Sequence, residues 1–151
     1  MSLCSVDVDA VTQYVSARDP DYQSWHSGNP GNATIFSLKN LSAADLGQIL
    51  DQTQEVVTNA DGARAIKVNI NARYLLLVRT AVVGWHNFVD ERGNAVRFTL
   101  SNDNGQRPRV SLESIAALPS WLVRELALRI IGENSLSRTE EKNSGASFDE
   151  Q

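Results

Sequence analysis

The sequence is poor in cysteine and histidine, and this limits the chemistry that the chain can carry. Cys4 is the only cysteine, so no internal disulfide can form and a disulfide scaffold is excluded. The two histidines, His26 and His86, lie sixty residues apart, and neither has a second His, Cys or carboxylate at the spacing of a metal site. Phosphate-binding glycine loops and the nucleophile elbow of hydrolases are also missing. The sequence therefore predicts no catalytic residue, no metal and no cofactor, and we expect the protein not to be an enzyme.

Long apolar runs and runs of positive charge are missing as well. The longest apolar run, residues 75–78, is far shorter than the roughly 20 residues that span a bilayer. The formal net charge is −4, whereas a sequence-independent nucleic-acid binder needs a basic face. The first ten residues contain neither the basic region nor the apolar region of a secretory signal. We therefore expect no membrane and no nucleic acid among the partners, and a cytoplasmic location.

Composition along the chain suggests one globular unit with two unlike ends. The 151 residues are 42% hydrophobic and 21% charged, as is usual for a single globular domain. Pro, Gly, Asp, Asn and Ser concentrate in residues 18–33, which reads as a loop, and Trp25 there either packs back or awaits a partner. We expect an N-terminal strand and loop segment at 1–33, a globular domain at 34–132, and a flexible, acidic, disordered tail at 133–151.

The stretch from residue 68 to residue 100 is the one around which the rest is organised. Its apolar residues recur with helical period, which predicts a helix from about Asn71, whose side chain would cap it, to a C-terminal Gly84. Residues 90–94 read as a turn. Beyond this turn apolar and polar residues alternate over 96–100, which predicts a strand. The periodic residues of the helix are Tyr74, Leu75, Leu77, Val78, Ala81 and Val82.

Shorter sequence patterns predict the remaining strands and helices. Alternation predicts strands at 11–16 and 34–38. Ser42 and Asp45 predict a helix start, and the helix would include Val56 and Val57 and end at 59–62. Residues 65–70 form either a strand with Ile66, Val68 and Ile70 inward or a backward extension of the central helix, and we favour the strand. Ser111 caps a short helix to Leu118, and a last helix covers 120–131 with Gly132 as its C-cap. Its apolar residues include the i, i+4 row Leu122, Leu126 and Ile130, and its polar remainder is Arg124, Glu125 and Arg129.

Together these elements predict an α+β fold. Three to four helices would pack with a small antiparallel sheet built from residues near 34–38, 66–70 and 95–100. Trp85 and Phe88, after the central helix, have two interpretations. They either lock the helix end against the following strand or form a protein–protein hot spot. The second interpretation predicts an exposed apolar groove with five partner-binding residues: Tyr74, Leu77, Ala81, Trp85 and Phe88.

Four motifs in order carry a resemblance to a known class of proteins. The first is the T-x-F-x-L strand at 34–38, and the second is G-W-H-N-F at 84–88, followed by the acidic turn from Asp90 to Gly93. The third is L-P-S-W-L-V-R-E-L-A at 118–127, and the fourth is the L-S-x-x-E-E-K-N-S segment at 136–144. Together they span residues 34–144 and resemble short morphogenesis proteins of tailed bacteriophages, of the class called tail assembly chaperones.

The resemblance implies a non-enzymatic function in virion morphogenesis. A tail assembly chaperone would bind tape-measure or tail-tube subunits in the host cytoplasm and keep them soluble until assembly, through protein–protein interaction and with weak self-association. Two alternatives stay open: a structural virion protein, as head–tail connector or capsid decoration, and a phage factor that acts on a host system.

Overall fold

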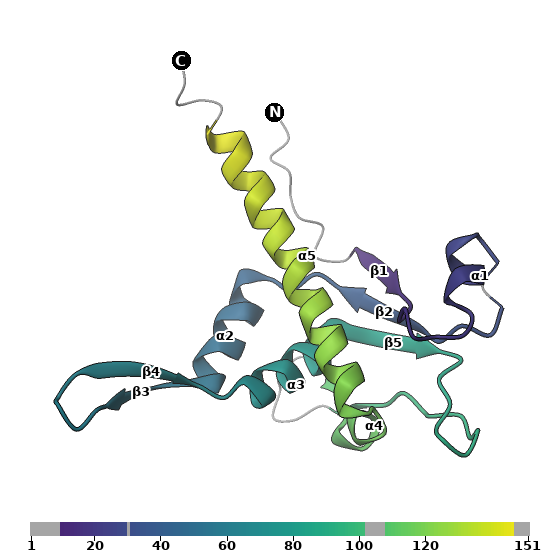
Figure 1. The fold of residues 1–151 in the computed structure, drawn as a ribbon, viewed down its shortest axis with the longest axis horizontal. Helices are drawn as coiled ribbons and strands as arrows, with labels where there is room; N and C mark the ends of the chain where they lie inside the picture. The colour runs from purple at the N-terminus through teal and green to yellow at the C-terminus, as the bar shows by residue number, and fades with distance from the viewer. Residues whose placement is uncertain (1–9, 30, 102–107, 147–151) are drawn as a thin grey trace.

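The computed structural model describes residues 10–29, 31–101 and 108–146, with residues 135–146 described only as part of a helix. Over these residues short strands and helices alternate along the chain (Figure 1). The α+β fold class that the sequence predicts is confirmed. The arrangement of the strands differs from the predicted one, as described below.

A three-stranded antiparallel sheet lies at the centre of the fold. Its middle strand is β2 (Ile35–Lys39), which pairs with β1 (Val11–Tyr14) on one side and β5 (Val82–His86) on the other. Side chains alternate across a strand, so Phe36 and Leu38 of β2 point to the same face, where both are buried. The hydrophobic core lies against this face of the sheet.

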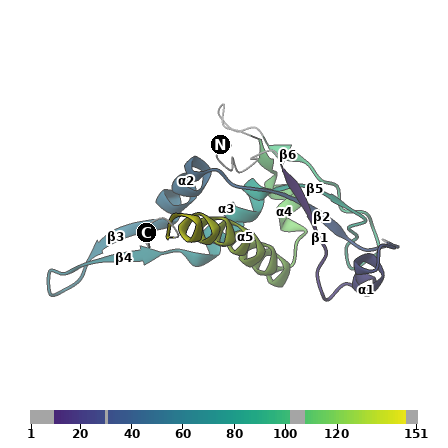
Figure 2. The ribbon, with the colours of Figure 1, turned by 90° about the horizontal axis from the view of Figure 1, so that it is seen from above.

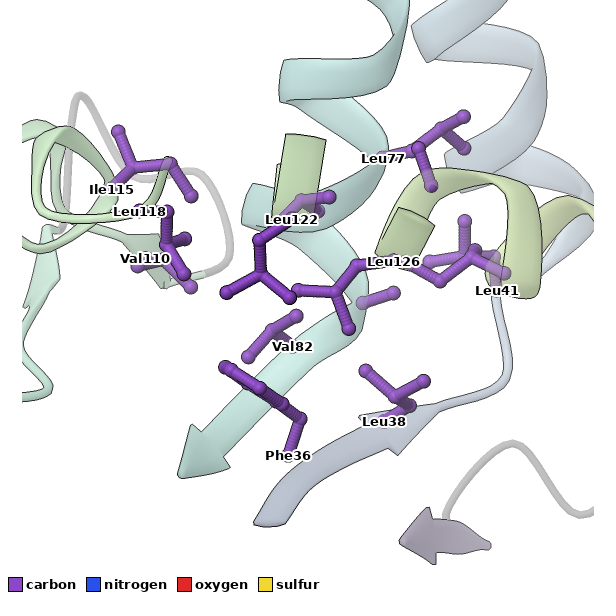
Figure 3. Packing of buried hydrophobic residues seen from close by; sticks show 14 of the residues in the cluster. Phe36, Leu38, Leu41, Leu77, Val82, Val110, Ile115, Leu118, Leu122 and Leu126 are labelled. Atoms are coloured by element: carbon purple, nitrogen blue, oxygen red, sulfur yellow. The ribbon is translucent and has the colours of Figure 1, made fainter. Parts of the chain in front are cut away.

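Helices cover that face and complete the core. Figure 3 shows side chains of β2, β5, α3 and α5 converging in one apolar cluster, with Leu122 and Leu126 of α5 close to Phe36 and Val82. At the edge of the cluster, Ile115 and Leu118 come from the segment of α4 and the turn after it. The helices are α1 (Tyr22–His26), α2 (Ala43–Thr53), α3 (Ile70–Ala81), α4 (Leu112–Ala116) and α5 (Ser120–Ala146).

Side-chain caps determine where three of the helices begin. Ser42 is the predicted N-cap of α2 and forms a capping box with Asp45, and the Ser111 hydroxyl accepts from the backbone N–H of Ser114 at the start of α4. The cap of α3 is Asn69, whose Oδ1 accepts from the N–H of Ala72 at 3.2 Å. The prediction that Asn71 caps this helix is therefore wrong by two residues.

The predicted helix over residues 43–58 is two elements. α2 ends at Thr53, and β3 (Gln54–Thr58) follows and pairs with β4 (Arg64–Val68) in a hairpin. Val56 and Val57 continue the spacing of the helix, but β-branched residues favour strands. The turn at 59–62 therefore joins two strands instead of ending a helix, and Gly62 has the positive φ of 83° that glycine tolerates.

The strand predicted at residues 65–70 exists, but its apolar side chains point to solvent. The strand, β4, ends at Val68, and Ile70 is the first residue of α3. Ile66, Val68 and Ile70 are all exposed, so the prediction that they face inward is wrong. Figures 1 and 2 give the reason: the β3–β4 hairpin extends away from the rest of the described chain, at the end opposite α1. The central sheet therefore does not contain this strand. The strand predicted at 95–100 is not part of the central sheet either.

Two boundaries of the central stretch also differ from the prediction. Gly84 does not end a helix: α3 ends at Ala81, and Gly84 lies inside β5. The predicted turn at 90–94 is confirmed, with the N–H of Asp90 bonded to the carbonyl of Asn94. Beyond it the chain pairs only through a Val89–Ala95 bridge and the short strand β6 (Leu100–Ser101), which lies beside β7 (Arg109–Val110).

β1 and α5 are the first and last elements of the described chain. β1 pairs along its length with β2 and is therefore part of the central sheet. α5 continues beyond Gly132 to Ala146, so Gly132 is not its C-cap. Residues 147–151, the end of the predicted tail, lie outside the described residues. Among the described residues, no helix combines the length and apolar character that crossing a bilayer requires.

Candidate functional site

The five predicted partner-binding residues lie in three different places. Leu77 and Ala81 are only 3% and 0% exposed, and both belong to the core. α5 packs along α3 and covers this face. An exposed groove through Leu77 and Ala81 is therefore not present, and this part of the prediction is wrong.

Trp85 and Phe88 form an aromatic cluster with Phe36 and Phe98. Ring centroids lie 5.4 Å apart between Trp85 and Phe88 and 4.9 Å apart between Trp85 and Phe98, with edge-on or tilted geometry throughout. The indole Nε1–H of Trp85 donates to the carbonyl of Val96 at 2.9 Å. These contacts match the packing interpretation, because they hold β5 against the segment that follows the 90–94 turn.

The backbone conformation of Asn87 directs the next side chain, Phe88, into the aromatic cluster. Asn87, directly after β5, has a φ of 60°, which asparagine tolerates better than most residues. Its backbone carbonyl accepts from the Thr34 hydroxyl at 2.9 Å, and its side-chain amide donates to the carbonyl of Ala33 at 3.4 Å. The backbone therefore turns at Asn87, where these two hydrogen bonds hold it, and Phe88 packs beside Phe36.

The fifth residue, Tyr74, lines a groove between the N-terminal half of α3 and the first turns of α5. The volume of this groove is about 1130 Å³. Ile70 and Tyr74 are four residues apart on α3, and Trp121 and Leu128 are seven apart on α5, so each pair shares one helix face. Ile70, Trp121 and Leu128 are 46%, 41% and 48% exposed. We call this feature the α3–α5 groove; it is lined by Arg18, Ile70, Asn71, Tyr74, Leu75, Ser120, Trp121, Val123, Arg124, Glu125 and Leu128.

A second cleft, of about 670 Å³, lies beside the first and includes Phe88. Its walls come from the 16–20 turn, the 88–94 segment and the turn between α4 and α5. Arg18 and Trp121 line both hollows, and the Arg18 guanidinium carbon lies 4.6 Å from the centre of the Trp121 ring. This cation–π contact is therefore part of the lining of both hollows.

Charges behind the α3–α5 groove come from α5 and from the end of β1. Glu125 acts on Tyr14, and burial, the negative charge of Glu125 and a hydrogen bond to its carboxylate raise the pKa of Tyr14 from 10.0 to about 12. Arg129 opposes this shift; its guanidinium carbon lies 5.5 Å from the Tyr14 ring centre, and its Nε lies 3.2 Å from the Glu133 carboxylate. The lining of the groove therefore combines apolar side chains with Glu125, which belongs to this charged network.

Sequence reasoning missed Trp121 and Leu128, although a signal was present. The row Leu122, Leu126 and Ile130 correctly indicates the inner face of α5, since all three are buried. The remaining face of the helix is predicted to be polar, but Trp121 and Leu128 are exposed on it. Two large apolar residues seven positions apart on an otherwise polar face indicate a second contact surface.

No cluster of three or more His, Cys, Asp or Glu side chains with the geometry of a metal site occurs in the described parts of the chain. Comparison of the chain with protein-family models, with curated proteins and with solved structures gives no significant match. Arguments about function therefore rest on the residues themselves.

The aromatic cluster generates a stability prediction for Trp85. Trp85→Ala should lower the free energy of unfolding by about 3 kcal/mol, because it removes a packed ring and its hydrogen bond. Trp85→Phe keeps one ring but loses the hydrogen-bond donor and part of the packed ring surface, so it should cost less, about 1–2 kcal/mol. Urea unfolding followed by circular dichroism measures both. An unchanged unfolding midpoint for Trp85→Ala would contradict the packing interpretation.

The raised pKa of Tyr14 predicts a loss of stability at alkaline pH. Between pH 10.0 and about 12 the unfolded chain releases the Tyr14 proton while the folded chain keeps it, so rising pH favours the unfolded state. This contribution is fully present below pH 10.0. Unfolding midpoints measured on both sides of pH 10.0 should fall less steeply with pH for Tyr14→Phe than for the wild type. Equal slopes would mean that Tyr14 does not carry the effect.

Proposed function

We propose that this chain is a non-enzymatic protein-binding protein of the tail assembly chaperone kind. In this proposal the α3–α5 groove binds an apolar segment of a tail protein, either the tape-measure protein or a tail-tube subunit. The observation that carries the proposal is the exposure of Ile70, Trp121 and Leu128, three large apolar side chains that line one groove.

The groove has the features of a site for an amphipathic segment. Helix-in-groove recognition needs apolar anchors on the walls and polar groups at the rim, and here Asn71, Ser120 and Arg124 accompany the apolar residues. Tryptophan is enriched among residues that dominate binding energy. The Arg18 contact orders the Trp121 ring, so less side-chain entropy is lost when a client binds.

The expected affinity suits a chaperone that must release its client. Full burial of a Leu or Ile side chain contributes about 1.5–3 kcal/mol, and these anchors are already half covered. After the cost of association, which is at least about 4 kcal/mol, a few such anchors leave a moderate net affinity. An assembly protein can then displace the chain from its client.

Leu128→Asp tests the groove directly. The tape-measure and tail-tube proteins encoded by the same genome are each co-expressed with this chain, and the soluble client that co-purifies is measured. We expect wild type to retain one of them and Leu128→Asp to reduce the amount at least about tenfold, because the remaining apolar burial of Leu128, about 0.8–1.5 kcal/mol, is lost and a charge would have to be buried against the client. Thermal unfolding should barely change, since Leu128 lies outside the core.

Leu112→Asp is the matched control, because Leu112 is exposed on α4 and does not line the groove. This variant should retain the client. If neither tail protein co-purifies with wild type, or if both variants bind equally, the proposal is wrong.

The alternative of a structural virion protein is favoured by one observation, the projecting β3–β4 hairpin. An arm of this kind is suited to a permanent contact with a neighbouring subunit. Mass spectrometry of purified particles and of infected-cell lysate separates the two functions. The chaperone proposal expects the chain in the lysate and not in particles, whereas stoichiometric presence in particles would favour the connector or decoration function.

A further inference from the structure

The β3–β4 hairpin presents the most exposed large apolar side chains in the described parts of the chain. Val56 is 68% exposed and Ile66 is 66% exposed. Both views of the fold show the hairpin extending from the body without another element along its faces (Figures 1 and 2). A two-stranded hairpin is at best marginally stable by itself in water, so an uncovered apolar face on one calls for a partner.

Strand register brings these side chains onto one face. Val56 is directly opposite Ile66, and the flanking pairs on the same face are Gln54 with Val68 and Thr58 with Arg64. This face, which we call the arm face, has Val56 and Ile66 at its centre, Gln54 and Val68 at its base, and Thr58 and Arg64 at its tip. The other face has the charged pair Glu55 and Lys67 in opposite positions.

The hairpin is held firmly at its base, so the arm face has a defined position. Arg73 of α3 donates through Nε to the Thr53 hydroxyl at 3.1 Å and through Nη2 to the Gln54 side chain at 3.3 Å. The N–H of Asn69 donates to the carbonyl of Thr53 at 2.8 Å. The tip is also ordered, with the N–H of Asn59 bonded to the carbonyl of Ala63 at 2.8 Å. A partner therefore meets a preformed surface, which lowers the entropic cost of binding.

We propose that the arm face packs against the arm face of a second copy of this chain. The argument is the distribution of charge. The arm face has one charged side chain, Arg64, at its tip end, and its centre is neutral. Such a face needs no partner of opposite charge, because its apolar centre is complementary to itself. In a two-fold arrangement with antiparallel hairpins, Val56 and Ile66 meet their own copies, and the two Arg64 side chains lie at opposite ends.

The size of the arm face predicts a weak dimer. Two five-residue strands with a rise of about 3.4 Å per residue and a spacing of about 4.8 Å span roughly 17 by 10 Å, and the exposed side chains that protrude from this footprint present roughly 300–400 Å² of accessible surface. Two copies would bury roughly 600–800 Å², less than the about 1,200–2,000 Å² of stable interfaces. We therefore expect a dissociation constant in the range of about 10–500 µM. This inference does not depend on the α3–α5 groove or on the identity of any client.

Sedimentation equilibrium of the full chain over a concentration series up to about 1 mM tests the inference. The wild type should change from monomer to dimer mass across the series. Val56→Thr with Ile66→Thr keeps β-branched residues and thus the hairpin, but removes apolar surface. Ile66→Arg places like charges at the two-fold axis. Each variant should raise the dissociation constant at least tenfold, with a circular dichroism spectrum like that of the wild type.

Val57→Thr is the matched control, because it makes the same chemical change on the other face of the hairpin. It should dimerise like the wild type. A wild type that remains monomeric across the series would overturn the inference and assign the arm face to a different partner. A dimer that survives both arm-face variants would overturn it as well, since it would use another surface, such as the open edges of β3 and β4.

Discussion

Burial of Leu122 and Leu126 among β2, β5 and α3 is the interaction on which the rest of the fold depends. The three-stranded sheet and α3 each have an apolar face, and α5 packs against both faces and buries them. Because α5 packs along α3, Leu77 and Ala81 are buried and cannot contact another protein. The same packing places the outer residues of the two helices beside each other. The core and the α3–α5 groove are therefore the inner and outer sides of a single helix pair.

This explains why apolar residues appear on nearly every side of the central helix. Leu77, Val78 and Ala81 face the core, whereas Ile70 and Tyr74, one or two turns earlier, line the groove. α5 follows the same rule, with Leu126 inside and Leu128 outside. A helix that is apolar all round is normally buried all round. Here the additional apolar surface remains open to solvent, and this is the physical reason to expect a protein partner.

Local patterns predicted those elements that local interactions determine. The capping box at Ser42, the cap at Ser111, the turn at 90–94 and the inner row of α5 all follow from residues a few positions apart. Sheet membership could not be predicted in this way, because β2 meets β5 through a pairing of Phe36 with Trp85. Periodicity also does not tell which of two apolar faces is inward. Ile66 and Val68 alternate as a half-buried strand would, yet the hairpin leaves them exposed.

The arm face and the α3–α5 groove meet at one rigid corner of the chain. Val68 ends β4, Asn69 caps α3 and bonds to Thr53, and Ile70 begins the groove wall. Three consecutive residues thus connect the two surfaces without a flexible linker between them. In a dimer formed through the hairpins, each groove would hold a fixed position relative to the two-fold axis. A partner with two apolar segments could then bind both grooves at a set spacing, with a gain from effective concentration that a single copy could not supply.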